Sequence, residues 1–116
     1  MNSIVKKPWG SYQILKEGKN HLVKNIIVKP GEKLSLQSHS HRSEHWIIVE
    51  GIARITINKT IKIVKSNESI FIPKEAKHRI ENNNKEDLKI IEVQYGSFLQ
   101  EDDIIRYEDI YNRKLS

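Results

Sequence analysis

The sequence contains no cysteine, which excludes disulfide bonds and thiolate metal ligands. Proline and glycine are also sparse, with 3 and 5 residues in a chain of 116, and no proline- or glycine-rich linker divides it. No apolar run approaches the length of a membrane-spanning helix, and the N-terminus lacks the pattern of a secretory signal. The sequence therefore predicts one cytoplasmic domain over residues 1–116, built on a single hydrophobic core.

Positive charge exceeds negative charge but is not concentrated in one segment. The chain has 20 lysines and arginines against 15 acidic residues, which gives a formal net charge of +5. The lysines mostly alternate with apolar residues, and no basic run is interleaved with aromatic residues. This pattern argues against nucleic-acid binding. A net positive field instead favours a small phosphorylated substrate.

Short runs of β-branched and aromatic residues recur along most of the chain, separated by turn residues. The expected strands span residues 12–16, 22–29, 34–39, 46–49, 53–57, 61–64, 69–72, 77–81 and 88–95. Many short strands at this spacing are typical of an all-β sandwich or barrel. The apolar residues between Ile104 and Tyr111 are compatible with a helix, so we expect a short C-terminal helical tail packed on the barrel.

Two polar motifs stand out within this β pattern. They read Gly31-x5-Gln37-x-His39-x4-Glu44-x6-Gly51 and Asn67-x5-Pro73-x-Glu75-x2-His78-x3-Asn82. Residues two apart on a strand point to the same side, so Gln37 and His39 can reach one cavity, with Lys33 and Ser35 on the same side. Imidazole and carboxylate side chains suit zinc, cobalt, manganese, nickel or iron. The two spacings resemble the metal-binding motifs of the cupins, and they imply one divalent metal ion, zinc in the first place, held by Gln37, His39, Glu44 and His78.

Three positions depart from the usual cupin motifs. Gln37 stands where most cupins have a histidine, and its neutral amide is a weaker ligand. Asn67 and Glu75 stand where glycines are usual, so we expect a changed turn geometry at both. His45 has the opposite strand parity to Glu44 and is expected to face away from the site.

Longer segments carry a more specific resemblance. They are Lys7–Tyr12, Leu34–His39, His41–Trp46, Asn67–Ser69, Ile72–Pro73, His78–Arg79, Ile91–Gly96 and Glu101–Tyr111. Through them the chain resembles the C-terminal cupin domain of type II mannose-6-phosphate isomerases, which is usually fused to a mannose-1-phosphate guanylyltransferase. The resemblance implies a double-stranded β-helix, the cupin or jelly-roll barrel, for the single domain over residues 1–116. The nucleotidyltransferase half does not occur in this sequence, so we expect either a stand-alone protein, with a separate nucleotidyltransferase as a partner in the same pathway, or an excised domain.

The resemblance also implies an activity, a metal-dependent aldose–ketose isomerase that interconverts mannose 6-phosphate and fructose 6-phosphate or a close sugar phosphate. That chemistry moves a proton between two carbons and needs a base, an oxyanion stabiliser and a phosphate clamp. On this resemblance Glu92 is the expected base, and Arg106 is expected to stabilise the charge of the enediolate or the phosphate. Further candidates for substrate binding are Lys33, Arg42, Arg79 and Gln94.

Two other interpretations stay open on the residues alone. A non-catalytic cupin would bind a sugar and show no turnover once metal is restored. A different cupin enzyme, such as an iron dioxygenase or a sugar epimerase, would consume oxygen or depend on an acid–base pair such as His–Tyr. In each case we expect a homodimer, because Ile47 and Val49 point outward from a strand whose other side carries Trp46 and Ile48.

Overall fold

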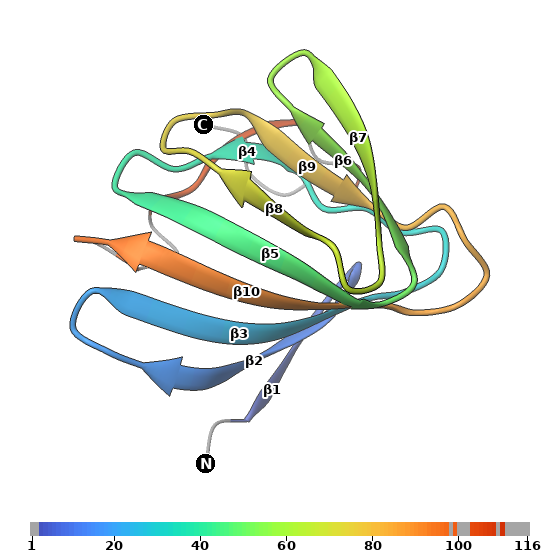
Figure 1. Ribbon diagram of the computed structural model, residues 1–116, viewed down its shortest axis with the longest axis horizontal. Coiled ribbons are helices and arrows are strands. Elements are labelled where there is room, and N and C mark those ends of the chain that lie inside the picture. The colour runs from blue at the N-terminus through green and yellow to red at the C-terminus, as the bar shows by residue number, and fades with distance from the viewer. Residues whose placement is uncertain (1–2, 98, 100–102, 109, 111–116) are drawn as a thin grey trace.

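The structure is a computed structural model that describes residues 3–97, 99, 103–108 and 110. Its strands form two antiparallel sheets (Figure 1). The six-stranded sheet contains, in spatial order, β1 (Ile4–Lys7), β2 (Gly10–Glu17), β3 (His21–Val28), β10 (Leu88–Gly96), β5 (Arg42–Glu50) and β8 (Ser69–Ile72). The five-stranded sheet contains β11 (Ile105–Glu108), β4 (Leu36–Ser38), β9 (His78–Glu81), β6 (Ile52–Ile57) and β7 (Thr60–Lys65).

The predicted all-β architecture is confirmed. Each of the expected strands is present with shifts of a few residues at its ends, and β8 has the predicted bounds. The structure adds β1, which pairs with β2 in a hairpin at the edge of the six-stranded sheet. None of the helices in the described part of the chain is long and apolar enough to cross a membrane.

The predicted helical tail is wrong in its described part. Residues Ile105–Glu108 form strand β11, which pairs with β4 through Ile105–Ser38 and Arg106–Gln37. A short apolar run fits a helix or a strand equally well by its spacing. Here the unpaired edge of β4 offers backbone hydrogen bonds, and an extended segment takes them. The rest of the predicted tail, residues 109 and 111–116, lies outside the described residues.

The interior changes from apolar to polar along the strands of the six-stranded sheet. On β5 the inward residues run from Ile48 through Trp46 to Glu44, and on the neighbouring β10 they run from Ile90 to Glu92. The register pairs Ile48 with Ile90 and Trp46 with Glu92. Inward side chains at the same level of the two strands therefore lie side by side and form layers across the sheet. The apolar layers make the core, and the polar layers line a site at one end of the interior.

The two motif positions without glycine keep the conformation that glycine usually supplies. Asn67 has a φ of 70° and Glu75 has a φ of 66°, both in the left-handed region. The expectation of a changed turn geometry is therefore wrong. The Glu75 turn is held by a hydrogen bond of 2.8 Å from its backbone N to the carbonyl oxygen of His39, and this contact ties the second motif to the first.

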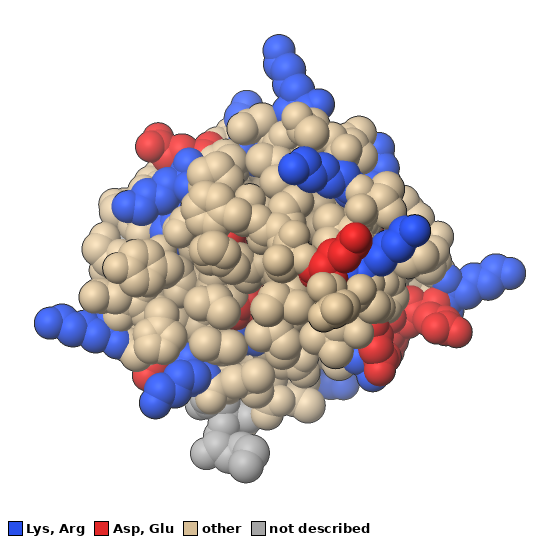
Figure 2. Space-filling model, viewed as in Figure 1, with Lys and Arg blue, Asp and Glu red and all other residues tan. Residues whose placement is uncertain are grey.

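One outer face of the molecule is largely uncharged. Figure 2 shows a broad uncharged middle, with lysine and arginine side chains projecting around the edge. On the outward sides of β5, β8 and β10, four large apolar side chains are between 44% and 59% exposed. They are Ile47, Val49, Phe71 and Tyr95. Ile47 and Val49 thus point outward as the sequence predicted, while Trp46 and Ile48 belong to the core.

Candidate metal and ligand site

Three of the four predicted metal ligands converge at the polar end of the interior. His39 follows β4, Glu44 lies in β5 and His78 begins β9, and all three are buried. Their nearest ligand atoms all lie within 4.8 Å of one another. His39 Nε2 is 3.2 Å from Glu44 Oε2, and His78 Nε2 is 3.9 Å from Glu44 Oε1. Segments far apart in the sequence thus place three donor groups around one point.

Hydrogen bonds to backbone carbonyls determine, for each imidazole, which nitrogen carries the hydrogen and which presents a lone pair to that point. His39 Nδ1 lies 2.8 Å from the carbonyl oxygen of Asp103, and His78 Nδ1 lies 2.9 Å from that of Ala76. A carbonyl oxygen only accepts, so both Nδ1 atoms carry the hydrogen and both Nε2 atoms present lone pairs to Glu44. This arrangement is typical of metal-bound histidine, whose second nitrogen is held by a backbone carbonyl or carboxylate.

The local electrostatics keep both imidazoles neutral. Burial, and then the positive charge of Arg42, lower the pKa of His39 to about 3. Burial also lowers the pKa of His78. A neutral imidazole is the form that binds a metal. Two imidazoles and one carboxylate therefore fit zinc, manganese, iron, cobalt or nickel, and the choice among these metals stays a prediction.

Gln37, the fourth predicted ligand, lines the same hollow. Its backbone pairs with His78 across β4 and β9, and its Nε2 donates a 3.0 Å hydrogen bond to Ser35 Oγ. That bond holds the amide beside the histidine cluster. Coordination by the Gln37 oxygen stays a prediction.

Arg42 was predicted to bind substrate phosphate, and the structure places it against the metal ligands. Its Nε donates to Glu44 Oε2 at 2.9 Å, and its Nη2 lies 3.2 Å from His39 Nε2. The residue is only 4% exposed. The position depends on Gly96, because a Cβ there would lie 2.0 Å from the carbonyl oxygen of His41 and 2.8 Å from the Cα of Arg42.

Glu92 lies behind the metal ligands in a chain of buried hydrogen bonds. Trp46 Nε1 donates to Glu44 Oε1 and to Glu92 Oε2, each at 3.0 Å, and Gln94 Nε2 donates to Glu92 Oε1 at 2.7 Å. Burial, followed by the charge of Glu44, raises the pKa of Glu92 to about 7. Glu92 is thus suited to hold or release a proton near neutral pH.

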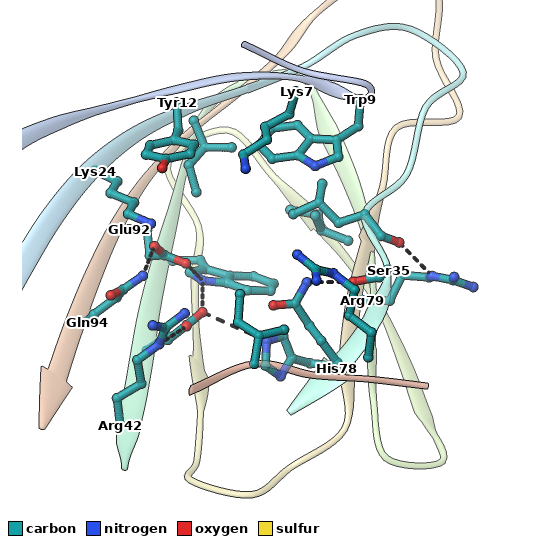
Figure 3. A pocket seen from close by; sticks show the side chains of 18 residues that line it. Lys7, Trp9, Tyr12, Lys24, Ser35, Arg42, His78, Arg79, Glu92 and Gln94 are labelled. Atoms are coloured by element: carbon teal, nitrogen blue, oxygen red, sulfur yellow. Dashed lines mark hydrogen bonds and ion pairs between the residues drawn. The ribbon is translucent and has the colours of Figure 1, made fainter. Parts of the chain in front are cut away.

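A hollow opens in front of this cluster, and its wall carries more positive than negative groups. Figure 3 shows Lys24, Glu92 and Gln94 on one side of it and Ser35 and Arg79 on the opposite side. Among the described residues, five cationic side chains line the hollow against two carboxylates, Glu44 and Glu92. The cations are Lys7, Lys24, Arg42, Arg79 and Arg106. The hollow encloses about 630 Å³ with the open solvent at its mouth included.

Lys33 is not among the described residues that line the hollow. It forms an isolated bridge with Glu81, and its charge helps lower the pKa of Glu108 after the larger effect of Arg79. Strand parity alone had placed Lys33 beside Ser35, and the irregular chain before β4 breaks that extrapolation. Arg79 does line the hollow, while its guanidinium donates to Glu108 Oε1 at 2.7 Å.

Two buried side-chain atoms, in residues that line this hollow, have no hydrogen-bond partner among the described residues. They are Gln94 Oε1, an acceptor, and Arg106 Nε, a donor. Unpaired buried groups are costly and are found where a ligand or water completes the site. Both residues were singled out from the sequence, and the structure brings them to the same hollow.

Asp103 was missed by the motif analysis. Its carboxylate accepts hydrogen bonds from Ser40 N at 3.1 Å, His41 N at 2.9 Å and His41 Nδ1 at 3.0 Å, and its carbonyl holds His39. Partial burial acts to raise the pKa of Asp103, but these bonds outweigh it and lower the pKa. No local pattern marks this role, because Asp103 lies 64 residues from His39.

The curated relatives of this chain include a mannose-1-phosphate guanylyltransferase and an alginate biosynthesis protein. It is 51% identical over 113 residues to mannose-1-phosphate guanylyltransferase ManC of Salmonella typhimurium, covering 97% of this chain and 24% of that protein. It is 50% identical over 109 residues to the alginate biosynthesis protein AlgA of Pseudomonas putida, covering 94% of this chain and 22% of AlgA. The chain thus spans about a quarter of the length of the relatives it matches.

These names correct the predicted activity. We expected an aldose–ketose isomerase, but the relatives are named as a guanylyltransferase, which is a different enzyme class, and as alginate and xanthan biosynthesis proteins. The isomerase assignment is therefore wrong, although the name of the family below mentions it. Glu92 and Arg106 both line the hollow, and the catalytic roles expected of them rested on the isomerase prediction.

The fold prediction is confirmed by solved structures. An RmlC-like cupin from Shewanella frigidimarina superposes with a TM-score of 0.76 at 20% sequence identity, covering 87% of each chain. At this identity the likeness shows the cupin fold alone. The family model described as "Mannose-6-phosphate isomerase C-terminal" matches residues 1–109. The chain therefore belongs to the mannose-6-phosphate isomerase C-terminal family of cupin domains.

Proposed function

We propose that this chain is a metal-dependent sugar-phosphate-binding domain that serves the formation of mannose nucleotides for polysaccharide biosynthesis. The observation that carries the proposal is the hollow lined by five cations beside the His39, Glu44 and His78 cluster. An excess of buried or half-buried cations attracts an anionic ligand and is relieved by it. The names of the relatives direct attention to mannose 1-phosphate as that ligand.

The unpaired atoms of the hollow fit such a molecule. Arg106 Nε is a donor for a phosphate oxygen, and Gln94 Oε1 is an acceptor for a sugar hydroxyl. A sugar phosphate carries both a charged acceptor and several hydroxyl donors. Glu92, with a pKa raised to about 7, can donate a hydrogen bond when it is protonated and accept one when it is not.

A metal ion held by His39, Glu44 and His78 would act as a Lewis acid toward ligand oxygens. The chain itself supplies the orientation of that site. Backbone carbonyls hold both imidazoles, and Trp46 holds Glu44 and Glu92 in one hydrogen-bonded row. We place the domain in the cytoplasm, working beside a guanylyltransferase, as part of the same chain or as a separate partner.

Both tryptophans of the chain, Trp9 and Trp46, line the hollow, so intrinsic fluorescence reports its occupancy. With zinc present, mannose 1-phosphate and mannose 6-phosphate should change the fluorescence in a saturable way, and mannose should not. The Arg106→Gln variant should bind mannose 1-phosphate about 10-fold or more weakly, because it loses a charge-assisted hydrogen bond.

The matched control is Arg54→Gln. Arg54 pairs with Glu81 on the five-stranded sheet and does not line the hollow among the described residues, so its loss should leave ligand affinity unchanged. If neither sugar phosphate perturbs the fluorescence of the zinc-loaded protein, and calorimetry shows no heat of binding, the proposed function is wrong.

A further inference from the structure

The guanidinium of Arg42 occupies the same lone pairs that a metal ion would use. It donates to Glu44 Oε2 at 2.9 Å and lies 3.2 Å from His39 Nε2. His39 Nδ1 is already committed to the Asp103 carbonyl, so Nε2 accepts from Arg42. Two of the three converging ligand residues are therefore bound by one positively charged side chain.

A metal ion and this guanidinium cannot share His39 Nε2, because a neutral imidazole nitrogen has one lone pair. Glu44 Oε2 has a second lone pair, but a divalent ion bound there would stand within a few ångströms of a fixed positive charge, and like charges repel strongly in a buried site. Binding of the metal therefore requires Arg42 to leave His39 and favours its departure from Glu44.

The released side chain remains close to the hollow. Arg42 is among the hollow's lining residues and is only 4% exposed, so it would be a buried charge without its carboxylate. A buried charge without a partner is strongly unfavourable. Both oxygens of the neighbouring carboxylate Glu92 already accept hydrogen bonds, from Trp46 and Gln94, which makes Glu92 a poor replacement. An anionic ligand in the hollow would provide the missing partner, and a phosphate matches the fork of a guanidinium.

We propose that Arg42 is a displaceable internal cation that couples metal binding to binding of the ligand's anionic group. Arg42 holds Glu44 and His39 in place before the metal binds, moves away when the metal arrives, and then pairs with the anion. Metal and ligand thus strengthen each other's binding. The displacement of Arg42 by the metal depends on the metal ligands alone. The coupling between metal and anionic ligand rests on the proposed sugar-phosphate function.

The displacement is tested with zinc and no ligand. Zinc affinity is measured by competition with a chromophoric chelator for the wild type, Arg42→Met and Arg54→Met. Removing the internal competitor should tighten zinc binding by about 10-fold or more. Arg54→Met breaks an arginine–glutamate pair elsewhere and changes net charge equally, so it should leave zinc affinity unchanged. Equal or weaker zinc binding by Arg42→Met would overturn the proposal.

A second measurement uses the wild type and covers the case in which Arg42→Met does not fold. In ¹⁵N-labelled protein the Nε–H signal of Arg42, assigned by its loss in Arg42→Lys, reports the bond to Glu44. Saturating zinc should shift this signal, and mannose 1-phosphate should shift it again. A signal that does not move when zinc saturates the site would show that Arg42 stays in place.

The coupling is tested by repeating the zinc titration with saturating mannose 1-phosphate. The wild type should bind zinc about 5- to 150-fold more tightly, zinc should tighten the ligand by the same factor, and Arg42→Met should lose the effect. If the ligand binds but zinc affinity does not change, the coupling is wrong. If the ligand does not bind at all, the proposed function fails, and the zinc titration without ligand still decides the displacement.

Discussion

At the scale of single residues, the polar end of the interior depends on a carboxylate that is not itself a predicted metal ligand. Glu92 is 5% exposed and lies opposite Trp46 of β5. This pair is two positions along the strands from the pair that Glu44 forms with Gln94. Its hydrogen bonds from Trp46 and Gln94 would favour ionisation, yet burial and the charge of Glu44 dominate and raise its pKa to about 7. The folded, metal-free protein therefore holds a proton on Glu92 at a higher pH than the unfolded chain does.

This raised pKa predicts a pH dependence of stability in the metal-free protein. Between about pH 4.5 and 7 the unfolded chain loses the Glu92 proton while the folded protein keeps it, so the free energy of unfolding falls as pH rises. The decrease should be on the order of 3 kcal/mol, and it should level off above pH 7. Urea unfolding with EDTA at a series of pH values measures it.

Glu92→Gln should flatten this decrease, because the amide does not titrate. Glu50→Gln is the control, since Glu50 is an exposed carboxylate at the end of the neighbouring strand β5 and pairs with Lys89. It should unfold with the same pH dependence as the wild type. Parallel pH profiles for Glu92→Gln and the wild type would show that Glu92 has an ordinary pKa.

At the scale of elements, the site depends on β11 and the residues just before it, although the metal motifs lie elsewhere. Asp103 orients His39 through its carbonyl and braces the segment after His39 through its carboxylate. Tyr107 and Glu108 of β11 add contacts with Ser38 and Arg79. The C-terminal strand therefore supports the metal site from behind.

Asp103→Ala keeps the backbone carbonyl that holds His39 but removes the carboxylate that braces the segment after it, so zinc binding should weaken by about 10-fold or more. His41→Ala removes only the side-chain contact of 3.0 Å and leaves both backbone contacts, so its effect should be much smaller. Chelator competition measures both affinities, and thermal unfolding confirms that each variant folds. Unchanged zinc affinity in a folded Asp103→Ala variant would contradict the supporting role of this segment.

The strands and the metal ligands could be predicted because both follow from local spacing. Alternation along a strand puts Glu92 and Gln94 on one side, and the structure agrees. The position of Asp103 and the pairing of β11 with β4 could not be predicted, since both depend on which distant segments meet. The role of Arg42 was also hidden, because parity places a side chain on a face without saying which atoms it contacts.

At the scale of the whole molecule, the uncharged outer face of the six-stranded sheet leaves large apolar side chains exposed in the part of the chain that the structure describes. Ile47 and Val49 on β5 and Phe71 on β8 are each 44% or more exposed, and Ile47 lies opposite the half-buried Ile91 of β10. An apolar surface across several strands favours association. We propose, as the sequence predicted, that this face joins two copies in a homodimer.

The proposed dimer predicts that Ile47→Lys separates the two copies. A lysine at this position would bring a charge into an apolar contact, and the same charge from the partner copy would face it across the two-fold axis. Light scattering at micromolar concentrations should give twice the chain mass for the wild type and a single chain mass for Ile47→Lys.

Ile63→Lys is the control, because Ile63 is 56% exposed on β7 of the other sheet. Zinc affinity should be the same in all three proteins, since the metal ligands lie on the inner side of the strands. A wild type with the mass of a single chain would contradict the dimer. A dimer that Ile63→Lys separates and Ile47→Lys does not would place the contact on another surface.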